Sequence, residues 1–207
     1  MRYHRIPNET VRRLPIYLRG LTLLSQQGLM SISSGKLSDF VNVNHWQIRK
    51  DFSYFGDFGK RGVGYNIDTL AKQIKKILNL DAVHRAVLVG VGNLGSALLT
   101  YPGFKMYGFE ITAAFDNDHA RIGKKIKDVT VEDISKLGTL AKRQVTLAII
   151  AVPEKAAQDV ADALVKAGIK GILNFAPLRI NIPKKVKVIT IDIATDLARL
   201  PYYIPSS

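Results

Sequence analysis

The sequence contains no cysteine, which excludes disulfide bonds, thiolate-bound zinc, iron–sulfur clusters and a cysteine nucleophile. Histidines are also scarce. No two of the four, His4, His45, His84 and His119, are spaced to share one face of a helix as metal ligands. The composition therefore predicts a protein without a metal site.

Long hydrophobic runs are missing as well. The longest, from Val145 to Pro153, is far too short to span a bilayer. The basic N-terminus, which carries Arg2 and Arg5, is not followed by the apolar core of a signal peptide. We therefore expect a soluble, cytoplasmic protein with no membrane partner.

Acidic residues are few relative to basic ones. The 207 residues include 17 Asp+Glu and 30 Lys+Arg, which gives a net charge of +13. Residues 1–80 carry 13 basic and 5 acidic residues, or +8, and the remainder carries +5. Because 47% of the residues are hydrophobic, the chain can bury a core and is not a disordered basic polymer. Its charge would attract a polyanion, chiefly nucleic acid or an anionic membrane surface.

The first 80 residues show the hydrophobic periodicity of helices. A first helix is predicted to end at Gly28, because apolar residues recur three or four positions apart before it: Val11, Leu14, Leu18, Leu21 and Leu24. Ser33-Ser34 would cap a short second helix, with Leu37 and Phe40 directed inward.

A third helix is predicted to begin at Asn44, because Asn44 and Gln47 have the spacing of a capping box. Its core face would carry Ile48, Phe52 and Phe55. The opposite side would carry polar and basic residues, namely Gln47, Arg49, Lys50, Ser53 and Tyr54. This succession is typical of a helix-turn-helix, whose last helix enters the major groove of DNA.

A glycine-rich segment follows and predicts a tight hairpin. Four glycines between residues 56 and 64 permit sharp turns, and Lys60 and Arg61 would lie at the tip. Such a wing beside a recognition helix can reach phosphates or the minor groove. A last helix would begin at an Asp68 cap.

Each of these features has an ordinary explanation. Basic residues commonly lie on solvated helix faces, and a glycine-rich basic loop can hold the phosphate of a small ligand. Because the helices, the turn and the charge of +8 occur together, the sequence favours a winged-helix DNA-binding domain.

The second region carries a dinucleotide-binding motif. The apolar run 86–89 precedes Gly90-Val91-Gly92-Asn93-Leu94-Gly95, and a helical segment follows. In this motif the three glycines make the tight turn, admit a pyrophosphate and allow close packing of helix on strand. The phosphates would lie at the helix N-terminus.

Asp116 supports this assignment, because it ends a second apolar run about 20 residues after the motif, where an acid would bind a ribose hydroxyl. An acid at this position favours NAD(H) over NADP(H), although the nearby Arg121 leaves that preference open.

Further apolar runs alternate with helical segments up to residue 191. This order predicts an α/β fold with a doubly wound parallel sheet of the Rossmann type, whose ligands bind at the carboxyl ends of the strands. Val152 and Pro153 follow one such strand and are candidate cofactor contacts.

A catalytic role is not expected. Tyr101 and Lys105 have the Tyr-x-x-x-Lys spacing of short-chain dehydrogenases, but Pro102-Gly103 would break the helix that this pair requires. We interpret this segment as a loop. A nicotinamide-dependent oxidoreductase with a basic N-terminal domain is the main alternative, and a protein that binds coenzyme A or another nucleotide is a second.

Several ordered motifs together resemble the bacterial Rex family. They are QIRKDFSYFG at 47–56, GKRGVGY at 59–65, GVGNLG at 90–95, YPGF at 101–104 and GILNFAP at 171–177. The resemblance covers essentially the whole chain. It implies a homodimeric transcriptional repressor that is released from operator DNA when NADH binds, with NAD⁺ competing for the same site.

The resemblance also implies roles for particular segments. It implies a winged-helix domain over 1–80, a dinucleotide domain over 81–191 and a C-terminal helix over 192–207 that is exchanged between protomers. The loop Asn174-Phe175-Ala176-Pro177 would lie near the nicotinamide. A redox-sensitive hydrogen-bonded set would comprise Arg19, Tyr101 and Asp192.

Overall fold

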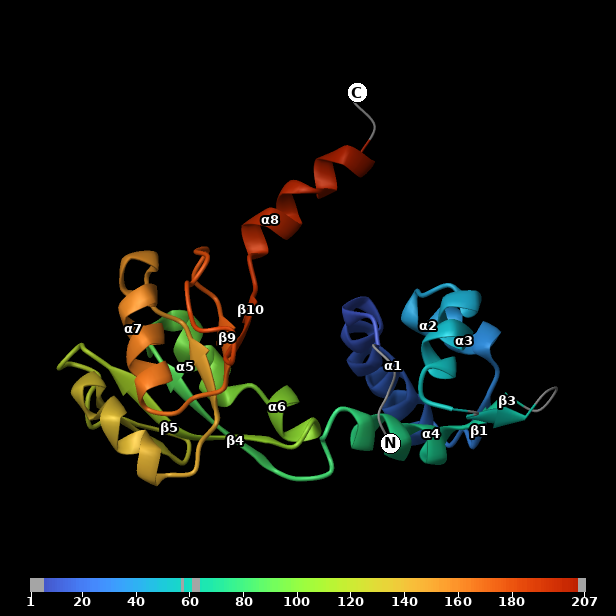
Figure 1. The fold of residues 1–207 in the computed structure, drawn as a ribbon, viewed down its shortest axis with the longest axis horizontal. Coiled ribbons are helices and arrows are strands. Elements are labelled where there is room, and N and C mark those ends of the chain that lie inside the picture. Colours follow the sequence, from blue (N-terminus) through green and yellow to red (C-terminus); the bar gives the residue numbers. More distant parts are fainter. Residues whose placement is uncertain (1–5, 57, 61–63, 205–207) are drawn as a thin grey trace. The chain divides into compact units, whose positions relative to one another are not determined.

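The computed structural model describes residues 6–56, 58–60 and 64–204. The chain forms two compact units, Met1–Ala82 and Val83–Ser207 (Figure 1). Each unit is described by itself below.

The N-terminal unit contains helices and a small antiparallel sheet. Its helices are α1 (Asn8–Gln26), α2 (Ser34–Val41), α3 (His45–Ser53) and α4 (Ile67–Ile77). Its strands are β1 (Ser31–Ile32), β2 (Gly59–Lys60) and β3 (Gly64–Asn66), in the order β1-β3-β2. The predicted hairpin is therefore present, and the strand β1, which the sequence did not predict, pairs with its second arm.

Helix α1 buries the predicted leucines, Leu14, Leu18, Leu21 and Leu24, but Val11 is exposed. Gly28 follows the helix with a φ of 82°, the left-handed conformation that glycine adopts after a helix C-terminus. Phe40 at the end of α2 is also exposed, so its predicted inward position is wrong.

Three details at helix ends differ from the prediction. Asn44 caps α3 by accepting a hydrogen bond from the Trp46 amide at 2.9 Å, but the Gln47 side chain turns to Asp51 and does not complete a capping box. Phe55 lies beyond the end of α3. Asn66 caps α4 by accepting from the Thr69 amide, because it precedes the first helical residue, whereas Asp68 lies within the first turn.

The second unit contains a seven-stranded sheet in the order β10-β9-β8-β4-β5-β7-β6. The strands are β4 (His84–Val89), β5 (Phe109–Asp116), β6 (Lys125–Ile126), β7 (Val129–Asp133), β8 (Leu147–Ile150), β9 (Gly171–Asn174) and β10 (Lys187–Thr190). All pairs are parallel except β6 with β7. The strand order reverses beside β4, so the predicted doubly wound Rossmann-type sheet is confirmed.

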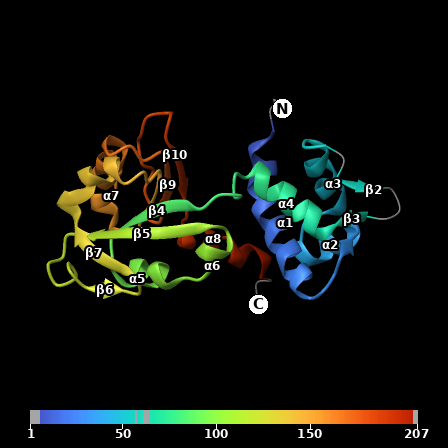
Figure 2. The same ribbon diagram turned by 90° about the horizontal axis from the view of Figure 1, so that it is seen from below.

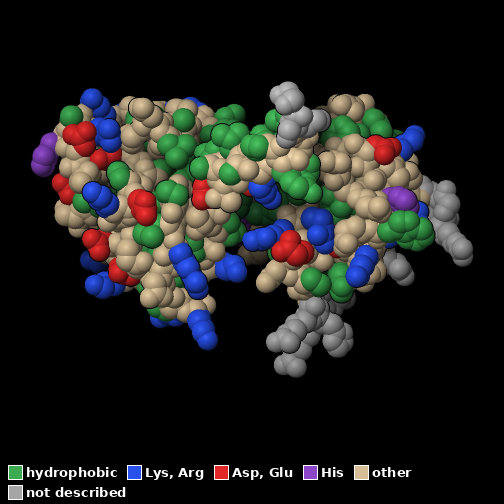
Figure 3. All heavy atoms as spheres, turned by 90° about the horizontal axis from the view of Figure 1, so that it is seen from above, with side chains coloured by type: hydrophobic (Ala, Val, Ile, Leu, Met, Phe, Trp, Pro, Cys, Tyr) green, Lys and Arg blue, Asp and Glu red, His purple; other side chains and the backbone are tan. Residues whose placement is uncertain are grey.

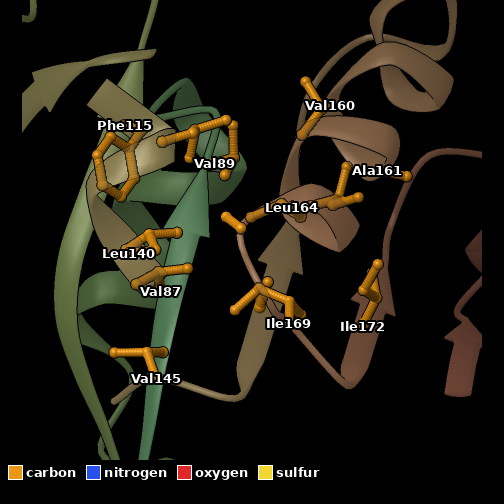
Figure 4. Packing of buried hydrophobic residues seen from close by; sticks show 14 of the residues in the cluster. Val87, Val89, Phe115, Leu140, Val145, Val160, Ala161, Leu164, Ile169 and Ile172 are labelled. Carbon is orange, nitrogen blue, oxygen red and sulfur yellow. The ribbon is translucent and has the colours of Figure 1, made fainter. Parts of the chain in front are cut away.

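Alternate residues of the strands face two different layers. Val87 and Val89 pack with η1 (Ile134–Lys142) and α7 (Glu154–Lys166), as Figure 4 shows for Leu164 of α7. Leu88 faces the other layer, where α5 (Asn93–Thr100) and α6 (Gly103–Met106) contribute Leu99 and Phe104. Figure 2 shows α7 and α5 on opposite sides of the strands.

The chain ends in a short apolar segment. It comprises α8 (Ile193–Ala198) and η2 (Leu200–Tyr203). Its large hydrophobic side chains, Ile193, Leu197, Leu200, Tyr202 and Tyr203, are all exposed. A helix with this composition requires a partner surface.

Candidate functional site

Helix α3 presents basic residues to solvent. Arg49, Lys50 and Ser53 are exposed, whereas Ile48 and Phe52 are buried in the core of the unit. Tyr54 follows the helix and is half-buried. The structure therefore brings most of the predicted DNA-contacting residues of this helix to one accessible surface, and their role stays a prediction.

Gln47 has a different position. Its side-chain nitrogen donates to Asp51 at 2.8 Å, and Asp51 is fully buried. The same carboxylate accepts from Thr10, from Arg13 at 2.6 and 2.8 Å, and from the Tyr17 hydroxyl at 2.6 Å. Because Thr10, Arg13 and Tyr17 belong to α1, this buried cluster connects α1 to the predicted recognition helix.

The ionisation of the cluster follows from these contacts. Burial alone would raise the pKa of Asp51, but its four hydrogen-bonding partners more than offset burial and hold the pKa below its usual range. Burial raises the pKa of Tyr17, and its hydrogen bond to Asp51 adds to that shift. Asp51 is therefore a charged carboxylate paired with Arg13.

Trp46 and Arg49 form a second feature that the sequence analysis missed. The Arg49 side chain donates from Nε to the Ser34 hydroxyl at 2.9 Å, and its guanidinium carbon lies 5.2 Å from the centre of the Trp46 ring. Trp46 itself is 66% exposed. An unusual tryptophan in a polar helix was the available signal, but its exposure depends on the fold.

The wing is anchored to α3 by aromatic packing. The Phe52 ring meets Phe58 edge-on at 5.7 Å and Tyr65 at 5.3 Å between ring centres. Lys60 ends the first arm of the hairpin, paired with Gly64. The predicted contact Arg61 lies outside the described residues.

Figure 3 shows one face of the molecule, on which acidic side chains are more numerous on the second unit than on the N-terminal unit. This agrees with the charges of +8 and +5 counted from the sequence.

The second candidate site lies at the carboxyl edge of the large sheet. Val89 pairs with Phe115 on one side and with Ile150 on the other, and Ile150 pairs with Asn174. This one row crosses four parallel strands. The predicted cofactor residues that follow these strands therefore lie at the same edge: 90–95, Asp116, Val152 and Pro153, and 174–177.

The glycines of the motif are required by their surroundings. Gly90 has a φ of 94°, and a Cβ there would lie 2.5 Å from the carbonyl oxygen of Ala151. A Cβ at Gly95 would lie 1.9 Å from the carbonyl oxygen of Gly90, because α5 packs directly on the end of β4. A Cβ at Gly92 would meet only the Arg121 guanidinium, at 3.8 Å.

Gly92 precedes α5 and has no side chain to cap it, so the first amides of the helix, at Asn93 and Leu94, face the loop. An adjacent recess of about 230 Å³ is lined by Val91, Gly92, Asn93, Ser96, Arg121, Lys124, Ile126 and Val131. Helix amides beside two basic side chains suit an anion such as a pyrophosphate.

Asp116 holds this loop in place. Its buried carboxylate accepts from the Val91 amide at 2.6 Å, from the Asp118 amide at 2.9 Å and from Arg121 at 3.2 Å. Burial would raise its pKa, but these bonds together lower it below its usual range. The predicted ribose contact stays a prediction, and the structure adds a loop-holding role that the sequence did not suggest.

Asn174 is fully buried and folds its own loop. Its amide nitrogen donates to the carbonyls of Ala176 and Leu178, and its side-chain oxygen accepts from the Ala176 amide. Asn174 therefore shapes the loop, and of its neighbours Phe175 is half-buried and Pro177 exposed.

The predicted switch residues are distributed over both units. Arg19 is exposed on α1 of the N-terminal unit. Tyr101 follows α5 and contacts Phe104 edge-on at 5.4 Å between ring centres. Asp192 caps α8 by accepting from the amide and the hydroxyl of Thr195, which lower its pKa. The pairing of these three residues stays a prediction.

The prediction that the segment from Tyr101 to Phe104 is a loop is partly wrong. Pro102 does separate Tyr101 from the next element, but Gly103–Met106 forms the one-turn helix α6. Proline is compatible with the start of a helix because the first amides have no partner there.

Within the part of the chain that the structure describes, no group of His, Cys, Asp or Glu could hold a metal ion. Among the same residues, none of the helices has both the length and the apolar character needed to cross a membrane.

Two family models match the chain. One, described as a putative DNA-binding protein N-terminus, covers residues 5–53, and the other, described as a CoA binding domain, covers residues 81–178. The boundary between them falls near the division between the two structural units.

Similar proteins cover nearly the whole chain. A redox-sensing transcriptional repressor Rex from Desulforamulus reducens is 47% identical over 98% of this chain and 97% of its own length. One of the same name from Carboxydothermus hydrogenoformans is 47% identical over 99% of both chains.

Solved structures of a repressor are also similar to this chain over nearly its whole length. The repressor RSP, in complex with β-NAD⁺ and operator DNA, has a TM-score of 0.90 and 36% identity over 97% of this chain and 93% of its own. RSP in complex with β-NADH has a TM-score of 0.87 and 34% identity over 97% of this chain and 94% of its own.

Proposed function

The chain belongs to the Rex family of redox-sensing transcriptional repressors, and on this premise we propose that NADH releases it from operator DNA while NAD⁺ competes for the same site. Residues 1–80 would bind the DNA and residues 81–191 the dinucleotide. Because it acts on bacterial operator DNA, the protein would work in the cytoplasm. Members of this family are repressors and not enzymes.

The uncapped N-terminus of α5 carries the dinucleotide part of this proposal. Gly92 leaves space beside the helix amides, and Asp116 fixes the loop through the Val91 amide. Val152, Pro153 and the 174–177 loop begin at the same edge of the sheet, where a ligand that extends from the loop would reach them.

Release by NADH requires two states of the protein with different affinities for the two nucleotides. Oxidised and reduced nicotinamide differ by one charge, so a carboxylate held ionised, such as Asp192, can distinguish them. In the proposed switch, Asp192 pairs with Arg19 in one state and with Tyr101 in the other. By thermodynamic reciprocity, operator DNA then weakens NADH binding by the same factor by which NADH weakens operator binding.

We expect NADH to lower the affinity for operator DNA in fluorescence-anisotropy titrations, and NAD⁺ to have little effect alone and to oppose NADH. A suitable duplex can be selected with the protein from a random-sequence library. Coenzyme A, which the second family model names, is the matched control ligand. Equal effects of NADH and NAD⁺ would exclude a redox switch, and release by coenzyme A would point to the alternative ligand.

We propose a homodimer as the active form. One face of the sheet carries an open apolar groove of about 490 Å³, lined in part by Ile111, Ile149, Leu173 and Ile189. The exposed apolar residues of α8 and η2 need a similar cover. In a dimer, the second copy would cover both the groove and the apolar residues of α8 and η2, with residues 192–207 exchanged between protomers.

Leu197→Asp should weaken dimerisation by about 100-fold or more, because lost leucine burial, about 2 kcal/mol, adds to the cost of burying a carboxylate. Sedimentation velocity over a range of concentrations measures this change. Lys155→Asp, on the exposed side of α7, is the control and should leave the dimer intact. A wild-type protein that sediments as a monomer at all concentrations would contradict the proposed dimer.

A further inference from the structure

Trp46 is exposed on the surface that the proposed function assigns to DNA. It is the sole tryptophan of the sequence, and 66% of its surface is accessible. Tryptophan offers a large apolar ring and one N–H donor, a combination that is enriched at binding interfaces.

The position of Trp46 on α3 favours double-stranded DNA as its partner. Residues three, four and seven positions apart share one helix face, and Trp46, Arg49, Lys50 and Ser53 are all exposed. Trp46 also lies in the first turn of α3, and residues near the N-terminus of a recognition helix contact base edges. The basic neighbours match a polyanion better than the apolar surface of a protein.

Trp46 also restricts Arg49. The guanidinium lies over the indole ring at 5.2 Å, and its Nε is bound to the hydroxyl of Ser34, a buried residue of α2. Arginine has five N–H donors, so four remain for a base or a phosphate. Restriction before binding lowers the entropy lost when the complex forms.

On these grounds, which rest on the proposed function, we propose that Trp46 determines operator specificity together with Arg49. The indole packs against the methyl group of a thymine in the major groove, which is the apolar group that bases present there. It also holds the Arg49 guanidinium toward the DNA. Trp46 is therefore a contact residue and a positioning residue.

The first test removes thymine methyl groups. In the selected operator duplex, each thymine is replaced in turn by deoxyuridine, which lacks only the methyl group. Wild-type protein should bind one or two of these duplexes several-fold more weakly, whereas Trp46→Ala should bind all of them equally. If no replacement affects the wild type, the methyl contact is wrong.

The second test compares variants. Trp46→Ala should bind the operator at least about tenfold more weakly, with a much smaller loss for a duplex of unrelated sequence. Lys50→Ala removes a positive charge from the same face and is the control; it should weaken both duplexes alike and reduce the salt dependence. Unchanged operator affinity of Trp46→Ala would overturn the proposal, as would equal losses for both duplexes.

Wild type and Trp46→Ala must have the same far-ultraviolet circular dichroism spectrum and the same urea midpoint for the N-terminal unit, which shows that the unit carrying the substitution is folded. They must also bind NADH equally, since Trp46 lies in the other unit. Failure of the wild-type protein to select any duplex from the random-sequence library would contradict the proposed function itself. A wild-type protein that binds DNA and is released by NADH, with Trp46→Ala behaving identically, would contradict this inference alone.

Fluorescence adds an independent readout because tryptophan emission comes from one position. Operator DNA should change the emission of Trp46, in step with the anisotropy of the labelled duplex. Emission that is unchanged at saturating operator would show that the indole stays in water. Emission that changes with protein concentration, without DNA, would show that a second copy covers it.

Discussion

Replacing Asp51 with alanine is expected to lower the free energy of unfolding of the N-terminal unit by about 3 kcal/mol. The substitution leaves the Arg13 guanidinium without its carboxylate and the buried Tyr17 hydroxyl without its acceptor. Loss of one partner of a buried pair costs about 3–5 kcal/mol, and the lower end applies because Arg13 is 23% exposed. Urea denaturation of the full chain, followed by the emission of Trp46, measures the loss.

Asp39→Ala provides the matched control, since this carboxylate is exposed on α2 of the same unit. Its effect should stay within about 0.5 kcal/mol. If Asp51→Ala is as stable as Asp39→Ala, the buried cluster does not stabilise the unit. Operator affinity should fall with stability in Asp51→Ala, because the cluster joins α3 to α1.

The same prediction has a pH dependence. The pKa of Asp51 is lower in the folded protein than its usual value of about 3.9, so its stabilising contribution is complete above that value. It is lost as the pH falls through the lower, folded-state pKa. The stability difference between wild type and Asp51→Ala should therefore be constant near neutral pH and shrink below about pH 4.

The second large effect is expected from Gly95→Ala, which should weaken NADH binding by about 100-fold or more. A Cβ at this position would lie 1.9 Å from the Gly90 carbonyl oxygen, so α5 must move away from β4. The displaced loop must return to its wild-type geometry to bind the nucleotide, and meeting an overpacking cost of about 3 kcal/mol at that step corresponds to about two orders of magnitude in affinity. Isothermal titration calorimetry with NADH measures the change.

Gly138→Ala is the control, because a Cβ there meets nothing within 4 Å. It should bind NADH as the wild type does. Should Gly95→Ala fail to fold, Gly92→Ala tests the same loop, since its Cβ has room but occupies space beside the helix amides. Wild-type affinity in both variants would contradict the assigned loop. A folded Gly95→Ala should still bind operator but no longer respond to NADH.

The sequence predicted those features that depend on neighbouring residues. The helix of residues 8–26, the Ser33 and Asn44 caps and the hairpin between residues 59 and 66 follow from local periodicity and turn chemistry. The Gly90 motif and the spacing to Asp116 predicted the sheet, because each glycine meets a requirement of one tight turn. The resemblance to Rex then correctly indicated the family.

Tertiary packing decided the rest. Three of the four donors to Asp51, Thr10, Arg13 and Tyr17, are 34 to 41 positions away. No local pattern in Arg-Lys-Asp distinguishes a buried carboxylate from a solvated one. In the same network the Gln47 amide nitrogen donates to Asp51, so it is not available at the predicted DNA surface. Asp116 was assigned to a ribose, yet the fold also places it under the Val91 amide.

The sequence by itself determined the family, the two types of unit and the positions of the glycines, because these depend on short-range geometry and on composition. Only the tertiary structure decided which polar side chains are buried and which face is left open. Burial and exposure depend on how distant elements pack. The exposure of Trp46 beside Arg49, and hence its proposed contact with the operator, is a property of the folded unit alone.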